Sequence, residues 1–307
     1  MRNDHEGISR VGETWQDELR RAVTSVAELS GQGYAFLDEN PGVAAVEAKY
    51  RTLVPPYYLS LINKADPEDP IAKIAFPSAA EIAPSVAGRR DPIGDLEKKA
   101  ASRLTHRYPD RALLHVTNLC PMYCRFCFRK NLMNEREEEL YRGDFEEAFA
   151  YLAAHPEIEE LILTGGDPWM LGNEKLRRLV DDVAARAPAI KRFRFHTRMP
   201  VTLPSRITPE LIEAILRPGR FQTIVVTHFN HPQEVSAEAR EGLRQLRRAG
   251  VLTLNQGVLL KGVNDNAATL RKLYLALGEE GVMPYYLHHC DLVEGGEHFR
   301  TTIEAGR

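Results

Sequence analysis

The chain has 307 residues, of which 43% are hydrophobic and 27% are charged, the composition of a soluble globular protein with one large or two modest domains. Its formal net charge of −3 gives no reason to expect nucleic acid or an anionic membrane as a partner. No apolar stretch approaches a membrane span, and the polar N-terminus is not a secretory signal, so a cytoplasmic protein is expected.

The first part of the chain, residues 1–105, is predicted to be a helical N-terminal extension. Apolar residues recur at helical spacing over Trp15–Leu29, and Pro55–Asn63 suggests a second short helix. Prolines and glycines interrupt the rest of the segment. We interpret this extension as packing for the domain that follows, residues 106–307.

From Arg111 onward, short apolar runs alternate with amphipathic segments. The predicted strands are Ala112–Val116, Glu160–Leu163, Arg192–Phe195, Thr223–Thr227, Val251–Leu254 and Met283–Leu287. The predicted helices between them are Phe145–Ala154, Glu174–Ala185, Pro209–Leu216, Glu234–Ala249 and Ala267–Leu277. Strands separated by helices of these lengths indicate parallel βα units and an α/β fold. The pattern fits an open doubly wound sheet as well as a barrel.

Three cysteines, Cys120, Cys124 and Cys127, follow the first predicted strand of this domain. In either architecture they lie at the C-terminal edge of the strands, where such folds place their chemistry. Three thiolates so close together can hold a cubane 4Fe–4S cluster and leave one iron free to bind a small molecule, whereas a ferredoxin-type cluster uses four cysteines. A zinc site would normally need a fourth Cys or His. The remaining cysteine, Cys290, is in an apolar strand-like run and is expected to be a buried structural thiol.

A second short motif, Gly165-Gly166-Asp167-Pro168, follows the second predicted strand. Its glycines allow the backbone to approach a ligand closely and to expose its amide groups, and Asp167 is able to accept a hydrogen bond from an ammonium group. By itself the motif also fits an ordinary turn. Its place one βα unit after the cysteine loop makes it a candidate ligand-binding turn.

Several blocks of the sequence, in one order, resemble the lysine 2,3-aminomutase family of radical S-adenosylmethionine (SAM) enzymes. They are His106–Arg111, the cysteine loop through Lys130, the Gly-Gly-Asp-Pro turn, Thr227–Pro232, Asn255–Gln256, Leu259–Asp265, Cys290–Leu292 and Glu297–Thr301. The resemblance implies a partial (β/α)6 radical SAM barrel that uses a 4Fe–4S cluster, SAM and pyridoxal 5′-phosphate (PLP). It implies an isomerase in which a 5′-deoxyadenosyl radical from SAM starts the migration of the α-amino group of an amino acid to the β-carbon.

The resemblance also implies roles for individual residues. They are Cys120, Cys124 and Cys127 for the cluster; Gly165, Gly166, Asp167, His228 and Gln256 for SAM; Arg107, Tyr108 and Arg111 for PLP; and Arg129 and Asp291 for the substrate. Arg129 would pair with the substrate carboxylate, which a planar guanidinium fits through two hydrogen bonds. Asp291 matches an aspartate that holds the distant amino group of lysine in the family, and a buried carboxylate there selects against substrates that lack the cation.

The implied substrate is therefore a basic amino acid, lysine or else arginine, in preference to glutamate. Isomerisation of lysine for attachment to an elongation factor is an alternative role within the family. An external electron donor such as flavodoxin or ferredoxin is an expected partner, and homo-oligomerisation is compatible with the resemblance. We expect no nucleic-acid or membrane partner.

The chain departs from the family near its end. The family's PLP-anchoring lysine lies beyond the position that matches Arg307, and none of the ten lysines present matches it, so no catalytic residue is assigned. We expect either a fragment of a longer protein, which is the interpretation we favour, or a variant without PLP anchorage. An interpretation of another class is a non-catalytic zinc or iron–sulfur scaffold.

Overall fold

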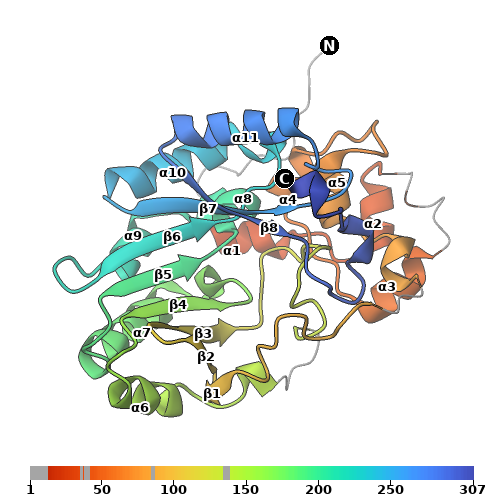
Figure 1. Ribbon diagram of the computed structural model, residues 1–307. Coiled ribbons are helices and arrows are strands. Elements are labelled where there is room, and N and C mark those ends of the chain that lie inside the picture. The colour runs from red at the N-terminus through yellow and green to blue at the C-terminus, as the bar shows by residue number, and fades with distance from the viewer. Residues whose placement is uncertain (1–12, 35–36, 38–41, 84–86, 134–138) are drawn as a thin grey trace.

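One eight-stranded sheet forms the centre of the computed structural model, which describes residues 13–34, 37, 42–83, 87–133 and 139–307 (Figure 1). The strands are β1 (Lys99–Ala101), β2 (Leu104–Tyr108), β3 (Arg111–Thr117), β4 (Glu160–Gly165), β5 (Arg192–His196), β6 (Gln222–Thr227), β7 (Leu252–Leu259) and β8 (Met283–His289). They lie side by side in chain order. β1, β2 and β3 pair antiparallel, and β3 to β8 pair parallel.

The order of the parallel strands decides between the two architectures that the sequence left open. A doubly wound sheet reverses its strand order at a switch point, but here each strand from β3 to β8 pairs with the next one along the chain. Because βα crossovers are right-handed, this order places the connecting helices on one face, and the sheet curls as a partial barrel. These helices are α6 (Glu146–Ala154), α7 (Asn173–Arg186), α9 (Pro209–Ile215), α10 (Ala237–Arg248) and α11 (Ala267–Glu279) (Figure 1).

Side chains on the parallel strands alternate between the helix-covered face and the inner face of the partial barrel. In β5, Phe193 and Phe195 are fully buried in the core shared with α6, α7 and α9. Arg194 and His196 therefore occupy the opposite, inner face. The inner face is rich in polar side chains, and the C-terminal ends of its strands carry the candidate site.

The sheet is larger than the sequence predicts. β7 continues to Leu259, beyond the predicted end at Leu254, and the antiparallel strands β1 and β2 are absent from the prediction. Because β2 spans Leu104–Tyr108, the predicted boundary after residue 105 falls inside a strand. Among the described residues, no helix combines the length and apolarity needed to cross a membrane.

Among its described residues, the N-terminal extension contains five short α-helices: α1 (Trp15–Arg20), α2 (Val26–Gly31), α3 (Val43–Lys49), α4 (Pro56–Ser60) and α5 (Pro70–Ala75). The single helix predicted over Trp15–Leu29 is wrong. Val23 leaves the helical path to pair with Val54 in an antiparallel bridge, and the Ser25 side chain then accepts a hydrogen bond from the Glu28 amide to begin α2. Tertiary pairing thus interrupts a segment whose apolar spacing is helical.

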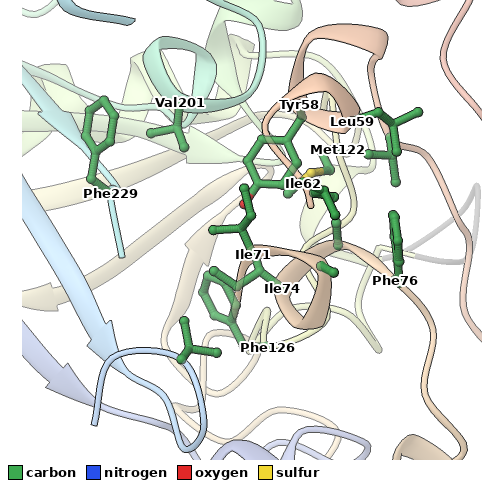
Figure 2. Packing of buried hydrophobic residues seen from close by; sticks show 14 of the residues in the cluster. Tyr58, Leu59, Ile62, Ile71, Ile74, Phe76, Met122, Phe126, Val201 and Phe229 are labelled. Atoms are coloured by element: carbon green, nitrogen blue, oxygen red, sulfur yellow. The ribbon is translucent and has the colours of Figure 1, made fainter. Parts of the chain in front are cut away.

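The extension packs directly on the cysteine loop. Figure 2 shows Tyr58, Ile71 and Ile74 of the extension beside Met122 and Phe126 of the loop, all buried in one hydrophobic cluster. Barrel residues, Val201 and Phe229 among them, complete the cluster. The loop is therefore held from both sides by apolar packing, which fixes the cysteines at the C-terminal edge of β3.

Candidate active site

The cysteine loop is anchored to the extension by backbone hydrogen bonds and by a buried ion pair. The Arg125 amide donates to the Ile74 carbonyl at 2.8 Å. The Arg125 guanidinium binds Glu81 with Nη2 2.6 Å from Oε2, and both side chains are at most 2% exposed. A buried cation with this pairing fixes the backbone between Cys124 and Cys127.

Glu81 also holds Lys130, which follows the cysteine loop. Lys130 Nζ donates to Glu81 Oε2 at 2.6 Å and to the carbonyls of Arg125 and Gly295 at 3.1 and 2.9 Å. Burial lowers the pKa of Lys130 to about 8, against the opposing effect of Glu81. All three donors of the ammonium group are used, so this lysine is a structural cation and not a free amine.

The three clustered thiols line one pocket. Cys120, Cys124 and Cys127 are partly exposed and form no disulfide, and the apolar side chains of Met122 and Met133 line the same pocket. Burial raises the pKa of each thiol, that of Cys127 to about 11. Such thiols become thiolates only when a bound metal or another positive charge stabilises them.

How closely the possible ligand side chains lie together indicates which kind of metal centre fits the pocket. In the part of the chain that the structure describes, no three His, Cys, Asp or Glu side chains lie close enough together to hold a single metal ion. Zinc needs ligands about 2.0–2.3 Å from one point. Three thiols that surround a pocket without converging on one point fit a cubane cluster better than a zinc ion.

The Gly-Gly-Asp-Pro turn packs backbone against backbone on the segment that leads into the cysteine loop. The amides of Gly166 and Asp167 donate to the carbonyls of Thr117 and Leu119 at 2.5 and 2.8 Å. A Cβ on Gly166 would overlap the Leu119 carbonyl, and Gly165 has a φ of +127°. The expectation that this turn exposes its amides to a ligand is therefore wrong for these two groups. The glycines allow β4 to lie against the loop.

The Asp167 carboxylate is occupied by protein donors. It accepts from the Thr197 hydroxyl at 2.8 Å, from the Arg198 amide at 2.6 Å and from the Trp169 amide at 3.0 Å. Burial raises the pKa of Asp167 to about 6, although these hydrogen bonds oppose the shift. In this structure Asp167 joins the ends of β4 and β5.

Of the SAM-binding candidates, His228 directly follows β6, and Gln256 lies within β7, three residues before its end. The His228 ring packs edge-on against Phe126 of the cysteine loop at 5.4 Å, and its Nε2 is buried without a hydrogen-bond partner among the described residues. Gln256 Nε2 lies 3.4 Å from His196 Nδ1. Burial lowers the pKa of His228 and that of His196, the latter to about 3, so both imidazoles are neutral. An unused buried nitrogen is a ready partner for a polar ligand.

The substrate candidate Arg129 is buried and is held by Asp95. Its Nε donates to Asp95 Oδ2 at 2.8 Å and its Nη1 to Thr164 Oγ1 at 2.9 Å. Burial alone would lower the pKa of Arg129, but Asp95 and Tyr141 outweigh it and raise the pKa. The other candidate, Asp291, follows β8. Burial raises its pKa, and the charges of His288, Arg300, His289 and Arg129, in decreasing order, oppose the rise.

The PLP candidates lie elsewhere. Arg107, Tyr108 and Arg111 flank the turn between β2 and β3, at the N-terminal end of β3. Because β3 has seven residues, this end is about 20 Å from the cysteine loop. The Arg111 guanidinium stacks on the Tyr108 ring at 4.6 Å, and Arg107 donates to the Ile93 carbonyl. Arginines in such an exposed cluster fit a phosphate group.

Sequence reasoning missed Asp95, His196, Arg198 and Glu234. Arg198 contacts Cys124 and Glu234, and Asp95 holds Arg129. A positional signal existed for His196 and Arg198, since they follow a predicted strand at the edge where α/β folds place their sites. No sequence signal marks Asp95 or Glu234. Cys290 is buried, as predicted.

Residues 114–273 match the family model of the radical SAM superfamily. Three similar proteins carry the name L-lysine 2,3-aminomutase. The protein of Clostridium subterminale is 36% identical over 95% of this chain and 70% of its own length. That of Fusobacterium nucleatum is 37% identical over 95% of this chain and 68% of its own length. That of Escherichia coli strain K12 is 37% identical over 96% of this chain and 85% of its own length.

Proposed function

Since this chain belongs to the lysine 2,3-aminomutase family of radical SAM enzymes, we propose that it moves the α-amino group of a basic amino acid, L-lysine first of all, to the β-carbon. Membership of the family makes it an enzyme that works with SAM. The observation that carries the proposal is the position of Arg129 and Asp291. Arg129 is buried and oriented by Asp95 and Thr164, and Asp291 follows β8 with a half-buried carboxylate that accepts no hydrogen bond from the described residues.

Cys120, Cys124 and Cys127 are the proposed ligands of a 4Fe–4S cluster, with His228 and Gln256 on the SAM side. When bound, the cluster and SAM supply a hydrogen-abstracting radical, and PLP supplies a carrier for the migrating amino group. Met122 and Met133 give the pocket apolar walls beside the thiols. The unpartnered Nε2 of His228 offers one hydrogen bond to the nucleoside cofactor. Gly165, Gly166 and Asp167 contribute indirectly, because they fix the loop that carries the cysteines.

Arg129 is the proposed partner of the substrate carboxylate. Asp95 and Thr164 use Nε and Nη1, and within the described residues no hydrogen bond engages Nη2. The guanidinium is thus oriented before substrate arrives, which reduces the entropy lost on binding. Its charge stays positive at every working pH.

Asp291 is the proposed partner of the distant ammonium or guanidinium group. Its carboxylate accepts no hydrogen bond from the described residues, and burial raises its pKa. A half-buried acid without a fixed donor gains most from a cationic partner. A side chain such as that of glutamate would bring a second negative charge to it, which disfavours glutamate as substrate.

The PLP requirement and its site are further parts of the proposal. Arg107, Tyr108 and Arg111 would hold the phosphate. Lys130 is engaged with Glu81 and two carbonyls, so it is not proposed as the lysine that carries PLP. A one-electron donor of the flavodoxin or ferredoxin type is the proposed partner that reduces the cluster.

Incubation of the reduced, SAM-loaded protein and PLP with lysine, arginine or glutamate, followed by chromatography of the amino acids, tests this assignment. We expect the β-amino isomer of lysine to form fastest. Asp291→Asn should raise the KM for lysine by about tenfold to a hundredfold, because the cation then meets a neutral amide. Asp182→Asn, on the outer helix α7, is the matched control and should leave KM unchanged. Preferential turnover of glutamate, or an unaltered KM for Asp291→Asn, would contradict the proposal.

A further inference from the structure

Arg198 is a buried cation that the sequence does not reveal. It directly follows Thr197 at the end of β5, and its backbone amide donates to Asp167 at 2.6 Å. The residue is 8% exposed. The Gly-Gly-Asp-Pro turn therefore fixes the position from which this guanidinium reaches toward the cysteine loop.

All three guanidinium nitrogens of Arg198 have partners. Nη1 donates to Cys124 Sγ at 2.8 Å, Nη2 to Glu234 Oε1 at 2.5 Å and Nε to the His228 carbonyl at 3.1 Å. The guanidinium also lies 5.4 Å above the Phe126 ring. Three hydrogen bonds in a planar fork leave the group a single orientation.

Glu234 in turn is held by groups other than Arg198. Its carboxylate is fully buried and accepts hydrogen bonds from the Tyr58 hydroxyl at 2.7 Å and from the backbone amide of Asn230 at 2.6 Å. Tyr58 belongs to α4 of the N-terminal extension. The extension thus supports the position of Arg198 through one buried carboxylate.

The three clustered cysteines differ in whether a charged side chain donates a hydrogen bond to the sulfur. Within the described part of the chain, Cys124 is the one clustered thiol that accepts a hydrogen bond from a charged side chain. A donor N–H and a positive charge at a cluster sulfur favour the reduced state, which carries one more negative charge, and so raise the reduction potential. Because Arg198 is buried, solvent screens this effect weakly.

We infer that Arg198 is a positioning residue that sets the reduction potential of the cluster through its hydrogen bond to Cys124, with Glu234 as the opposing charge. The inference rests on the proposed function, since it requires a cluster on the three cysteines. It assigns the end of β5 and the extension a part in electron uptake, in addition to cofactor binding.

The test is a reductive titration of anaerobically reconstituted protein without SAM, followed by electron paramagnetic resonance, with iron and sulfide measured in each sample. Arg198→Gln should shift the equilibrium between oxidised and reduced cluster at least about tenfold toward the oxidised form, a midpoint lower by about 59 mV for a one-electron couple. Arg198→Lys keeps the charge and should shift it less. Glu234→Gln removes the opposing charge and should shift the midpoint upward.

Arg194→Gln is the matched control. Arg194 lies on β5, the strand that leads to Arg198, has the same 8% exposure and pairs with its own carboxylate, Glu160, at 2.5 Å. The midpoint potential of the cluster in Arg194→Gln should equal that of the wild type. If the substitutions merely loosened the site, the midpoint potentials of the cluster in Arg198→Gln and Glu234→Gln would shift in the same direction.

Two outcomes separate the inference from the proposed function. A wild-type protein without a reducible cluster would overturn the proposed function. A reducible wild-type cluster whose midpoint is unchanged in Arg198→Gln, or whose midpoint in Glu234→Gln falls or stays the same, would overturn the inference alone. If Arg198→Gln does not retain iron, the inference is tested by the midpoint of Glu234→Gln alone: an upward shift supports it, and a downward shift or no shift overturns it.

Discussion

Replacement of Gly166 by alanine tests how the Gly-Gly-Asp-Pro turn supports the cysteine loop. The new Cβ would overlap the carbonyl of Leu119, which is backbone and cannot rotate away. Relief of such a contact costs about 1–3 kcal/mol. The separation would also stretch two backbone hydrogen bonds, those of the Gly166 and Asp167 amides, at about 1 kcal/mol each. We expect Gly166→Ala to lower the free energy of unfolding by about 3–5 kcal/mol.

Urea denaturation of the cluster-free protein, followed by far-ultraviolet circular dichroism, measures this change. Gly278→Ala is the control, since Gly278 lies in α11 with no atom within 4 Å of its added Cβ. Because alanine is the better helix former, that variant should be more stable than the wild type by about 0.5–1 kcal/mol. A Gly166→Ala variant within about 1 kcal/mol of the wild type would refute the close-packing argument.

Two further predictions concern buried charges. Glu81→Gln leaves Arg125 and Lys130 without their shared carboxylate, and it should lower the free energy of unfolding by about 3–5 kcal/mol in urea denaturation; a loss below about 1 kcal/mol would contradict the structural role of the pair. Asp167 has a folded pKa of about 6, above its ordinary value, so its contribution to stability is complete below about pH 4 and is lost as the pH rises through 6. Between pH 4 and 7, the free energy of unfolding of the wild type should therefore fall by about 2–3 kcal/mol relative to that of Asp167→Asn. If the free energies of unfolding of the two proteins depend on pH in the same way, the raised pKa of Asp167 is refuted.

The repeating βα units were predictable because their signals are local. Apolar runs such as Thr223–Thr227 lie within observed strands, and the alternation with helices sets their parallel pairing. The position of the cysteine loop followed from its place after the first of these strands. The strand order, and with it the choice of a partial barrel, depended on which strands pair, and the sequence pattern does not contain that information.

The missed site residues act over long distances in the sequence. Asp95 reaches Arg129 across 34 residues, and Arg198 reaches Cys124 across 74. Neither contact leaves a local pattern, because each depends on how β5 and the extension meet the cysteine loop. The two motif glycines pack closely on the carbonyls of Thr117 and Leu119, and the Gly166 amide bonds to the loop, so the expected display of free amides is wrong for that group.

The most direct test of the account is reductive cleavage of SAM by the anaerobically reconstituted protein. We predict a reducible iron–sulfur cluster whose electron paramagnetic resonance spectrum changes when SAM is added, with methionine and 5′-deoxyadenosine as products. Cys124→Ala should abolish both the spectral change and the products. A wild-type protein that binds one zinc ion, has no reducible cluster and leaves SAM intact would contradict the account.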